Sequence, residues 1–157
     1  MNKKIIIIIS ILLLLIIPLI YILTNNNKNI EKFYLTDNYY NNSQFIQIKS
    51  KEISNLNKDN YLLFTYNNYC TLPIPCEYIF EEFMKKYNIS IVSMPFIEYK
   101  KTNYYKKIKY APTIIIIKDG KIIDYLDANS NEDLNKYQNI EDFENWISKY
   151  IYLNNNQ

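Results

Sequence analysis

The feature that most constrains the fold is a strand, a cysteine-containing loop and a helix that follow one another between residues 62 and 87. Residues 62–66 are apolar, aromatic or β-branched, which predicts a buried strand. Apolar residues then recur at helical spacing, which predicts a helix with one buried stripe. The stripe consists of Cys76, Ile79, Phe80, Phe83, Met84 and Tyr87. Pro75 suits the first turn of that helix, and Cys70 lies in the loop before it.

This arrangement places thiols near a helix N-terminus. Unpaired backbone N–H groups and the helix dipole stabilise a thiolate there, so the sequence permits a reactive sulfur. The chain has no histidine. His-activated cysteine chemistry and His-containing metal sites are therefore excluded. Any base must be Lys, Asp, Glu, Tyr or water.

The remaining elements continue an alternation of strands and helices. Residues 112–117 and 122–126 predict a hairpin around Gly120. An apolar stripe from residue 140 to 151, preceded by Asn139 as N-cap, predicts a C-terminal helix. The other expected elements are a strand at 45–48, a short helix at 50–56 capped by Ser50, a strand at 89–96 that contains Pro95, and a polar helical crossover at 98–108. The order is βαβαβ followed by ββα.

With these pieces in this order, the chain resembles the thioredoxin superfamily over residues 44–153. Thioredoxins carry Trp-Cys-Gly-Pro-Cys between a strand and a helix, and a later strand begins with a cis-proline in a Pro-Thr pair. Tyr69-Cys70 matches the Trp-Cys step, and Pro75-Cys76 matches the Pro-Cys step. Pro112-Thr113 matches the cis-proline pair, and Gly120 lies eight residues after Pro112, as in the family.

The resemblance implies an α/β protein with a thioredoxin-like fold, in which helices flank a central mixed sheet. It also implies thiol–disulfide exchange, with Cys70 as the more exposed nucleophile and Cys76 as the thiol that resolves the mixed disulfide. The two roles would reverse if the loop turned Cys70 away. No cofactor and no metal ion are expected.

The same resemblance implies a peptide site beside the cysteines. A cis bond before Pro112 would leave backbone groups free to pair with an extended substrate. Tyr110 and Ala111 would line that site, and Tyr69 and Ile74 would supply its apolar rim. The alternative is that Pro112 simply begins a strand, where its missing N–H does no harm.

Two departures from the family leave the activity open. Five residues separate Cys70 from Cys76, whereas thioredoxins have two, so the redox potential of the family cannot be transferred. Phe64 stands six residues before Cys70, where many thioredoxins have a buried acid. Redox exchange is the first hypothesis. The alternatives are a redox-inactive binding or accessory module with a structural disulfide, and a cell-envelope protein with a stapled loop.

The N-terminal residues 1–24 predict a membrane anchor. An apolar run extends from Ile5 to Leu23 after two lysines. At about 1.5 Å per residue, it is just long enough to cross a bilayer core of about 30 Å. We expect an uncleaved single-pass helix with a cytoplasmic N-terminus, as in a membrane-anchored bacterial protein; a cleaved signal peptide and a secreted protein are the alternative. Residues 25–43 then form a spacer that is polar apart from Phe33-Tyr34-Leu35 and packs partly on the domain, and residues 44–153 form an extracytoplasmic domain.

Charge and location bound the possible partners. The chain has 18 basic and 16 acidic residues, and two of the lysines precede the apolar run, so the exported part carries no net charge and implies no nucleic-acid partner. Outside the cytoplasm a pair of cysteines oxidises readily. The expected partners are therefore thiols or disulfides of exported proteins or peptides, with a membrane redox protein as a further partner. The lysines between residues 100 and 109 predict a solvated face.

Overall fold

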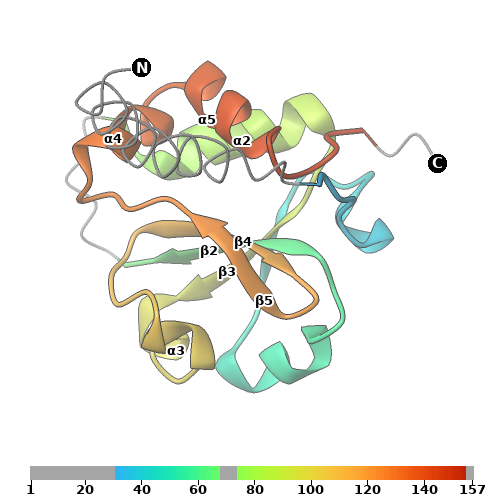
Figure 1. The fold of residues 1–157 in the computed structure, drawn as a ribbon, viewed down its shortest axis with the longest axis vertical. Helices are drawn as coiled ribbons and strands as arrows, with labels where there is room; N and C mark the ends of the chain where they lie inside the picture. Colours follow the sequence, from blue (N-terminus) through green and yellow to red (C-terminus); the bar gives the residue numbers. More distant parts are fainter. Residues whose placement is uncertain (1–30, 68–73, 155–157) are drawn as a thin grey trace, which may run out of the picture. The chain divides into compact units, whose positions relative to one another are not determined.

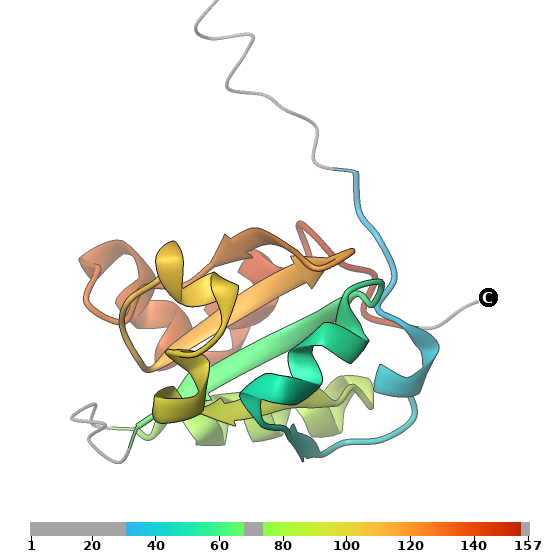
Figure 2. The same ribbon diagram turned by 90° about the horizontal axis from the view of Figure 1, so that it is seen from below.

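The computed structural model describes residues 31–67 and 74–154 (Figures 1 and 2). The chain divides into two compact units, Met1–Glu31 and Lys32–Gln157, and all elements given below belong to the second. The predicted anchor at residues 1–24 lies outside the described residues. Among the helices of the described ranges, none combines the length and the apolar character that a bilayer crossing requires.

Five strands form one mixed sheet in the order β1-β3-β2-β4-β5. The first three strands of this order run parallel, β4 is antiparallel to β2, and β5 is antiparallel to β4. The strands are β1 (Phe45–Gln47), β2 (Tyr61–Tyr66), β3 (Ile91–Pro95), β4 (Thr113–Lys118) and β5 (Lys121–Tyr125). The inner strands are buried along nearly their whole length, as their continuous apolar sequences predict. The predicted mixed sheet is confirmed.

Two longer helices and the short helix α4 (Asn131–Leu134) lie over one face of this sheet (Figures 1 and 2). The helix α2 (Cys76–Tyr87) packs against α5 (Ile140–Ile147). The opposite face carries α3 and the 3-10 helix η2. The short helices are η1 (Asp37–Tyr39), η2 (Ser50–Leu56), α3 (Phe96–Tyr99), η3 (Asn103–Lys106), α4 (Asn131–Leu134) and η4 (Asn135–Tyr137).

The core on the α2 side is largely aromatic. Phe80 of α2 contacts Phe64 of β2 and Phe143 of α5, with ring centres 5.0 Å apart in both pairs. Phe83, one turn further along α2, packs edge-on against Phe143 at 5.0 Å. These tilted and edge-to-face arrangements are the favoured geometries for aromatic pairs. They fix the position of α2, and therefore of Cys76 at its start.

Part of the predicted spacer belongs to the folded unit. Phe33, Leu35, Tyr39 and Tyr40 are buried, so the spacer packs on the domain over a longer stretch than Phe33-Tyr34-Leu35. Tyr40 donates its hydroxyl hydrogen to the carbonyl of Tyr152 at 2.7 Å and accepts the backbone N–H of Leu35 at 3.1 Å. A phenol with both functions paired can be buried without leaving a polar group unsatisfied.

The C-terminal helix begins as predicted but ends earlier. The Asn139 side chain accepts the backbone N–H groups of Glu141 and Asp142 at 2.8 and 3.2 Å, which confirms the cap. The sequence predicts a helix to residue 151, whereas α5 ends at Ile147. Ile151 instead forms a parallel bridge with Phe33. Backbone pairing with the N-terminal segment therefore replaces the last turn.

Two predicted helix starts are displaced. Ser50 does not cap the helix that follows it; Lys49 occupies the N-cap position of η2, and its N–H bonds to the Glu52 carboxylate at 2.8 Å. Ser50 donates its hydroxyl and its N–H to Glu98 at 2.7 and 3.1 Å. Pro75 occupies the N-cap of α2, one residue before the predicted first turn. Ser50 therefore bonds to the Glu98 carboxylate, whereas the local sequence predicts that it caps η2.

The predicted hairpin between β4 and β5 turns at Asp119 and Gly120, which have φ angles of 48° and 68°. A Cβ atom on Gly120 would lie 2.9 Å from the backbone oxygen of Asn57. The chain has a single glycine, and it stands at this position. Both the backbone conformation and the close approach require it.

Candidate functional site

Cys76 lies at the first residue of α2 and is completely buried. Its Sγ donates a hydrogen bond to Oε2 of Glu77, with 3.6 Å between the two atoms. Glu77 was not among the predicted site residues. The available signal was an acid in the first helical turn beside a cysteine, where the helix dipole favours negative charge. The structure therefore pairs the buried thiol with a carboxylate.

Hydrogen bonds hold the described residues on either side of the segment that contains the other cysteine. Cys70 and Tyr69 themselves lie outside the described residues. Before the segment, the Asn67 side chain donates to the carbonyl of Ala111 at 3.1 Å. After it, the Gln138 side chain donates to the Ile74 carbonyl at 2.8 Å and accepts the Ile74 N–H at 3.2 Å. Side-chain amides thus anchor the segment to the loops before β4 and α5.

The peptide bond between Ala111 and Pro112 is cis, as the resemblance implies. Both residues are half-buried. The next residue, Thr113, is buried and donates its hydroxyl hydrogen to the Leu126 carbonyl at 2.5 Å. Pro112 therefore lies just outside the first buried position of β4.

Tyr137 lies close to the start of β4 and to Cys76, and no motif in the sequence identifies it. Its hydroxyl donates to the Leu126 carbonyl at 2.7 Å, the same acceptor that Thr113 uses. Burial raises the pKa of Tyr137 well above its usual value, and negative charge on Cys76 is a further cause that raises this pKa. The phenol thus lies close to both Thr113 and the thiol, and it stays neutral near pH 7.

The other candidate peptide-site residues differ in their surroundings. Ile74 is 39 % exposed, as an apolar rim residue must be. Tyr110 is half-buried, and its ring centre lies 6.4 Å from that of Tyr125 on β5. Burial raises the pKa of Tyr110, with Asp127 and Tyr125 as further causes. Tyr110 therefore lies against the outer strand of the sheet.

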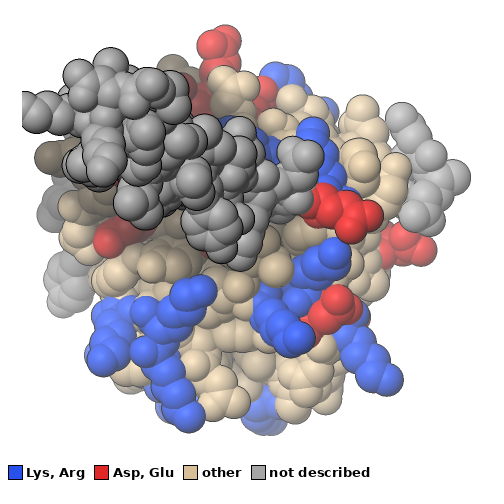
Figure 3. Space-filling view, in the orientation of Figure 1, with Lys and Arg blue, Asp and Glu red and all other residues tan. Residues whose placement is uncertain are grey.

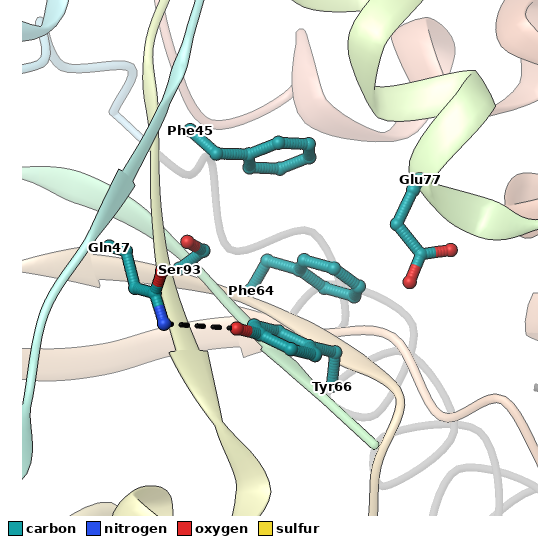
Figure 4. A pocket seen from close by; sticks show the side chains of 6 residues that line it. All are labelled: Phe45, Gln47, Phe64, Tyr66, Glu77 and Ser93. Atoms are coloured by element: carbon teal, nitrogen blue, oxygen red, sulfur yellow. Dashed lines mark hydrogen bonds between the residues drawn. The ribbon is translucent and has the colours of Figure 1, made fainter. Parts of the chain in front are cut away.

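A cavity of about 240 Å³ opens beside the start of α2 (Figure 4). Its lining consists of Phe45, Gln47, Phe64, Tyr66, Glu77 and Ser93. Figure 4 shows the Glu77 carboxylate extending from α2 toward Phe64 and Tyr66. Gln47 donates its side-chain N–H to the Tyr66 hydroxyl at 3.3 Å across the cavity. Glu77 is the one carboxylate in this lining.

Phe64 is 2 % exposed and packs within an aromatic cluster. Its ring centre lies 5.7 Å from that of Tyr66 and 5.8 Å from that of Phe45. The buried acid that many thioredoxins have on this strand is thus replaced by an apolar side chain. The carboxylate nearest to the described cysteine comes from the helix. Among the described residues, no group of three or more acids, cysteines or histidines could hold a metal ion.

The lysines between residues 100 and 109 are all exposed, which confirms the predicted solvated face. Lys101 pairs with Glu98. Lys100 lies 4.9 Å from the centre of the Phe96 ring. Figure 3 shows lysines on the lower part of the face in view, where Figure 1 places α3 and the hairpin. These side chains keep their charged ends in water while their stems cover apolar surface.

Comparison with known proteins gives no family model that matches the chain and no matching curated protein. Among solved structures, a thioredoxin from Schistosoma mansoni is 26 % identical, with a TM-score of 0.48 over 69 % of this chain and 97 % of that one. A mutant Entamoeba histolytica thioredoxin is 17 % identical, with a TM-score of 0.45 over 60 % of this chain and 96 % of that one. Spinach chloroplast thioredoxin f is 17 % identical, with a TM-score of 0.43 over 61 % and 85 %.

The fold follows from the strand arrangement itself. The sheet has the order β1-β3-β2-β4-β5, with β4 antiparallel to β2 and β5 antiparallel to β4. Along the chain, α2 with Cys76 at its start is the next helix after the central strand β2. The cis-proline precedes β4, the strand that pairs with β2. Both features agree with the family pattern that Pro75-Cys76 and Pro112-Thr113 indicate in the sequence. By its fold, the chain is a thioredoxin-like protein.

Proposed function

We propose that the protein is a thiol–disulfide oxidoreductase whose redox pair is Cys70 and Cys76. One observation carries this proposal. Cys76 is completely buried at the N-terminus of α2, in contact with the carboxylate of Glu77. A helix N-terminus stabilises a thiolate, and a neighbouring acid can accept the thiol proton.

The proposed reaction has two displacement steps. The Cys70 thiolate attacks a substrate disulfide, forms a mixed disulfide and releases one substrate thiolate. The Cys76 thiolate then attacks the Cys70 sulfur, which forms the Cys70–Cys76 bond and releases the second substrate thiolate. The substrate gains two electrons, and the cysteine pair loses them. The reverse sequence oxidises a substrate dithiol.

The proposed substrate is an extended segment of an exported protein, bound beside Pro112. Tyr110, Ala111 and Pro112 would line the peptide, with Tyr69 and Ile74 as its apolar rim. The exposure of Ile74 supports this placement. The Ala111 carbonyl already accepts one hydrogen bond from Asn67, but a carbonyl oxygen has two lone pairs and can accept another.

The proposed location is the outer side of a cell membrane. Support comes from the apolar run between Ile5 and Leu23, which would tether the folded unit, and from the scarcity of stable disulfides inside the cytoplasm. A membrane thiol protein would return the cysteine pair to its starting redox state.

The reduction potential of the cysteine couple tests the proposed function. The full-length protein in detergent is equilibrated in graded thiol–disulfide buffers, its thiols are alkylated, and the two redox forms are quantified by mass spectrometry. We expect a reversible couple between about −120 and −270 mV, the range of known exchange catalysts. A pair that stays oxidised below about −300 mV would be a structural disulfide and would overturn the proposal.

A second candidate is a redox-inactive module that binds peptides with the cis-proline face. The specific observation in its favour is Phe64, which fills the strand position of the usual acid and packs against Phe80 and Phe45. This candidate predicts peptide binding that is identical in the oxidised and reduced protein. Isothermal titration of one peptide against both forms separates the two functions.

A further inference from the structure

We infer that Glu77 is the proton acceptor for Cys76 when this thiol resolves the mixed disulfide. This inference rests on the proposed function, and it assigns to the helix a role for which β2 carries no acid. The contact is direct: the Cys76 Sγ donates its hydrogen to Glu77 Oε2 at 3.6 Å. This contact gives the proton a short path from sulfur to oxygen.

Among the described residues, the other titratable groups near Cys76 are neutral phenols or are already engaged in hydrogen bonds and ion pairs. The chain has no histidine. Tyr137, from η4, already donates its hydroxyl hydrogen to a carbonyl and remains a neutral phenol. Asp133, the acid in the neighbouring α4, binds the Asp127 N–H and Lys136. From β2, Tyr66 also presents a phenol and accepts its hydrogen bond from Gln47. A carboxylate is the stronger base in contact with the sulfur.

The cavity gives the proton a way to leave. Cys76 has no exposed surface, whereas Glu77 is half-exposed and lines the cavity. One oxygen of the carboxylate accepts the hydrogen bond of the buried thiol. The same side chain lines the open cavity, where Figure 4 shows it. Glu77 therefore connects a thiol that water cannot reach with water that can remove its proton.

The step balances as follows. The proton moves from Cys76 Sγ to Glu77 Oε2, and the resulting thiolate attacks the Cys70 sulfur of the mixed disulfide. The bond between Cys70 and the substrate breaks, and the substrate sulfur leaves with the electron pair. Glu77 then releases its proton to water in the cavity. No further oxidant or reductant takes part in this step.

The test follows this single step with dithiobis(nitrobenzoate) as the disulfide and the reduced, full-length protein. Each displacement releases one coloured nitrothiobenzoate, so the second release measures resolution by Cys76. This leaving group departs as a thiolate without needing a proton. The pH dependence of the second release therefore reports deprotonation of Cys76.

The test compares Glu77→Gln and Glu77→Asp with Glu81→Gln, which removes an exposed acid one turn further along α2. We expect Glu77→Gln to slow the second release about 10- to 100-fold near neutral pH, within the range for general-base catalysis. The rate of the second release in Glu77→Gln should rise about tenfold per pH unit, because hydroxide replaces the lost base. Glu77→Asp should recover part of the rate, and Glu81→Gln should match the wild type.

Two results separate the inference from the function on which it rests. A second release that is equally fast or faster in Glu77→Gln, in protein with unchanged circular dichroism, would overturn the role of Glu77 and leave exchange intact. A wild-type protein that gives the first release but never the second would overturn the resolving role of Cys76, and with it the proposed function.

Discussion

The two ends of β4 use their polar groups differently. At the Lys118 end, the hydroxyls of Tyr61 and Tyr104 lie 3.2 Å apart, and Tyr104 donates to the Gly120 carbonyl at 3.3 Å. Asp119 donates its N–H to the Asn60 side chain at 3.1 Å. These groups pair within the protein, so this end of the strand is a fixed structural corner.

At the Thr113 end, a thiol and a carboxylate that can exchange a proton lie beside an open cavity. Cys76 and Glu77 are in contact, and the carboxylate borders an open cavity. Ile74 exposes an apolar side chain next to this group. One strand thus separates two tasks: its hairpin end stabilises the sheet, and its proline end presents the candidate site. Changes at the two ends should therefore affect different measurements.

The largest effect should come from the thiol itself. Cys76→Ser should abolish turnover and leave stable mixed disulfides on Cys70, because a hydroxyl cannot resolve them. Cys70→Ser should also abolish turnover but trap no substrate. Non-reducing electrophoresis with a disulfide peptide distinguishes the two variants. Equal activity in both would contradict the two-step mechanism.

A large loss of stability should come from the opposite end of β4. Gly120→Ala places a Cβ atom 2.9 Å from the Asn57 backbone at a positive φ, and we expect it to lower the free energy of unfolding by about 2–4 kcal/mol. The rate of nitrothiobenzoate release per folded molecule should not change. Urea unfolding measures the first quantity. The control Asp119→Gly, also at positive φ, should unfold no more easily than the wild type.

An intermediate loss should follow from detaching α5 from the sheet. Asp124 of β5 accepts the Trp146 indole N–H at 2.8 Å and the Tyr150 hydroxyl at 2.5 Å. Asp124→Ala removes both charge-assisted bonds, and we expect a cost of about 1–3 kcal/mol in unfolding free energy. Thermal unfolding followed by tryptophan fluorescence measures it. The exposed Asp119→Asn serves as the control; a similar loss there would mean that Asp124 acts only through net charge.

A smaller effect is expected at Gln138, and it should be seen mainly in the reduction potential of the cysteine pair. Gln138→Ala removes the two bonds that anchor Ile74 after the cysteine segment. Both bonds are exposed, so the unfolding free energy should fall by about 1 kcal/mol or less. The reduction potential should become more oxidising by about 10–30 mV, because a looser segment brings the two sulfurs together less often. An unchanged potential would show that this anchor does not position the cysteines.

The smallest effect is a pH dependence at Glu98. Its hydrogen bond to Lys101, followed by those to Ser50, lowers the pKa of Glu98 from 4.5 to about 2. A lowered folded-state pKa stabilises the protein above the unfolded value, and this contribution is lost as pH falls from about 5 toward 2. The difference in unfolding free energy between wild type and Glu98→Gln should shrink over that range. Glu82→Gln, in a more exposed pair with Lys85, should show little pH-dependent difference.

The elements that local patterns determine were predictable from sequence. Continuous apolar runs identified β2 and β4, helical spacing identified α2, and Asn139 marked the start of α5. Gly120 indicated the hairpin because few residues tolerate a positive φ. In each case the physical cause lies within a few residues of the element it determines.

Features that depend on distant partners were not predictable. Tyr40 is buried because its hydroxyl reaches the Tyr152 carbonyl, and Ser50 leaves its capping role because Glu98 lies beside it. Tyr137 enters the candidate site only through the fold. Glu77 differs from these, since it is the neighbour of Cys76 in sequence and was overlooked because acids in a first helical turn are common.

The bridge between Phe33 and Ile151 brings the two ends of the described fold to one place. The Phe33 N–H bonds to the Tyr150 carbonyl at 2.9 Å, and the Tyr152 N–H bonds to the Phe33 carbonyl at 3.0 Å. A pull applied to the chain before residue 33 is therefore transmitted to the last residues of the fold through this bridge, and neither β4 nor α2 takes part in the bridge. A short peptide could join these ends, and the chain could be opened at another loop with the order of contacts in the sheet preserved.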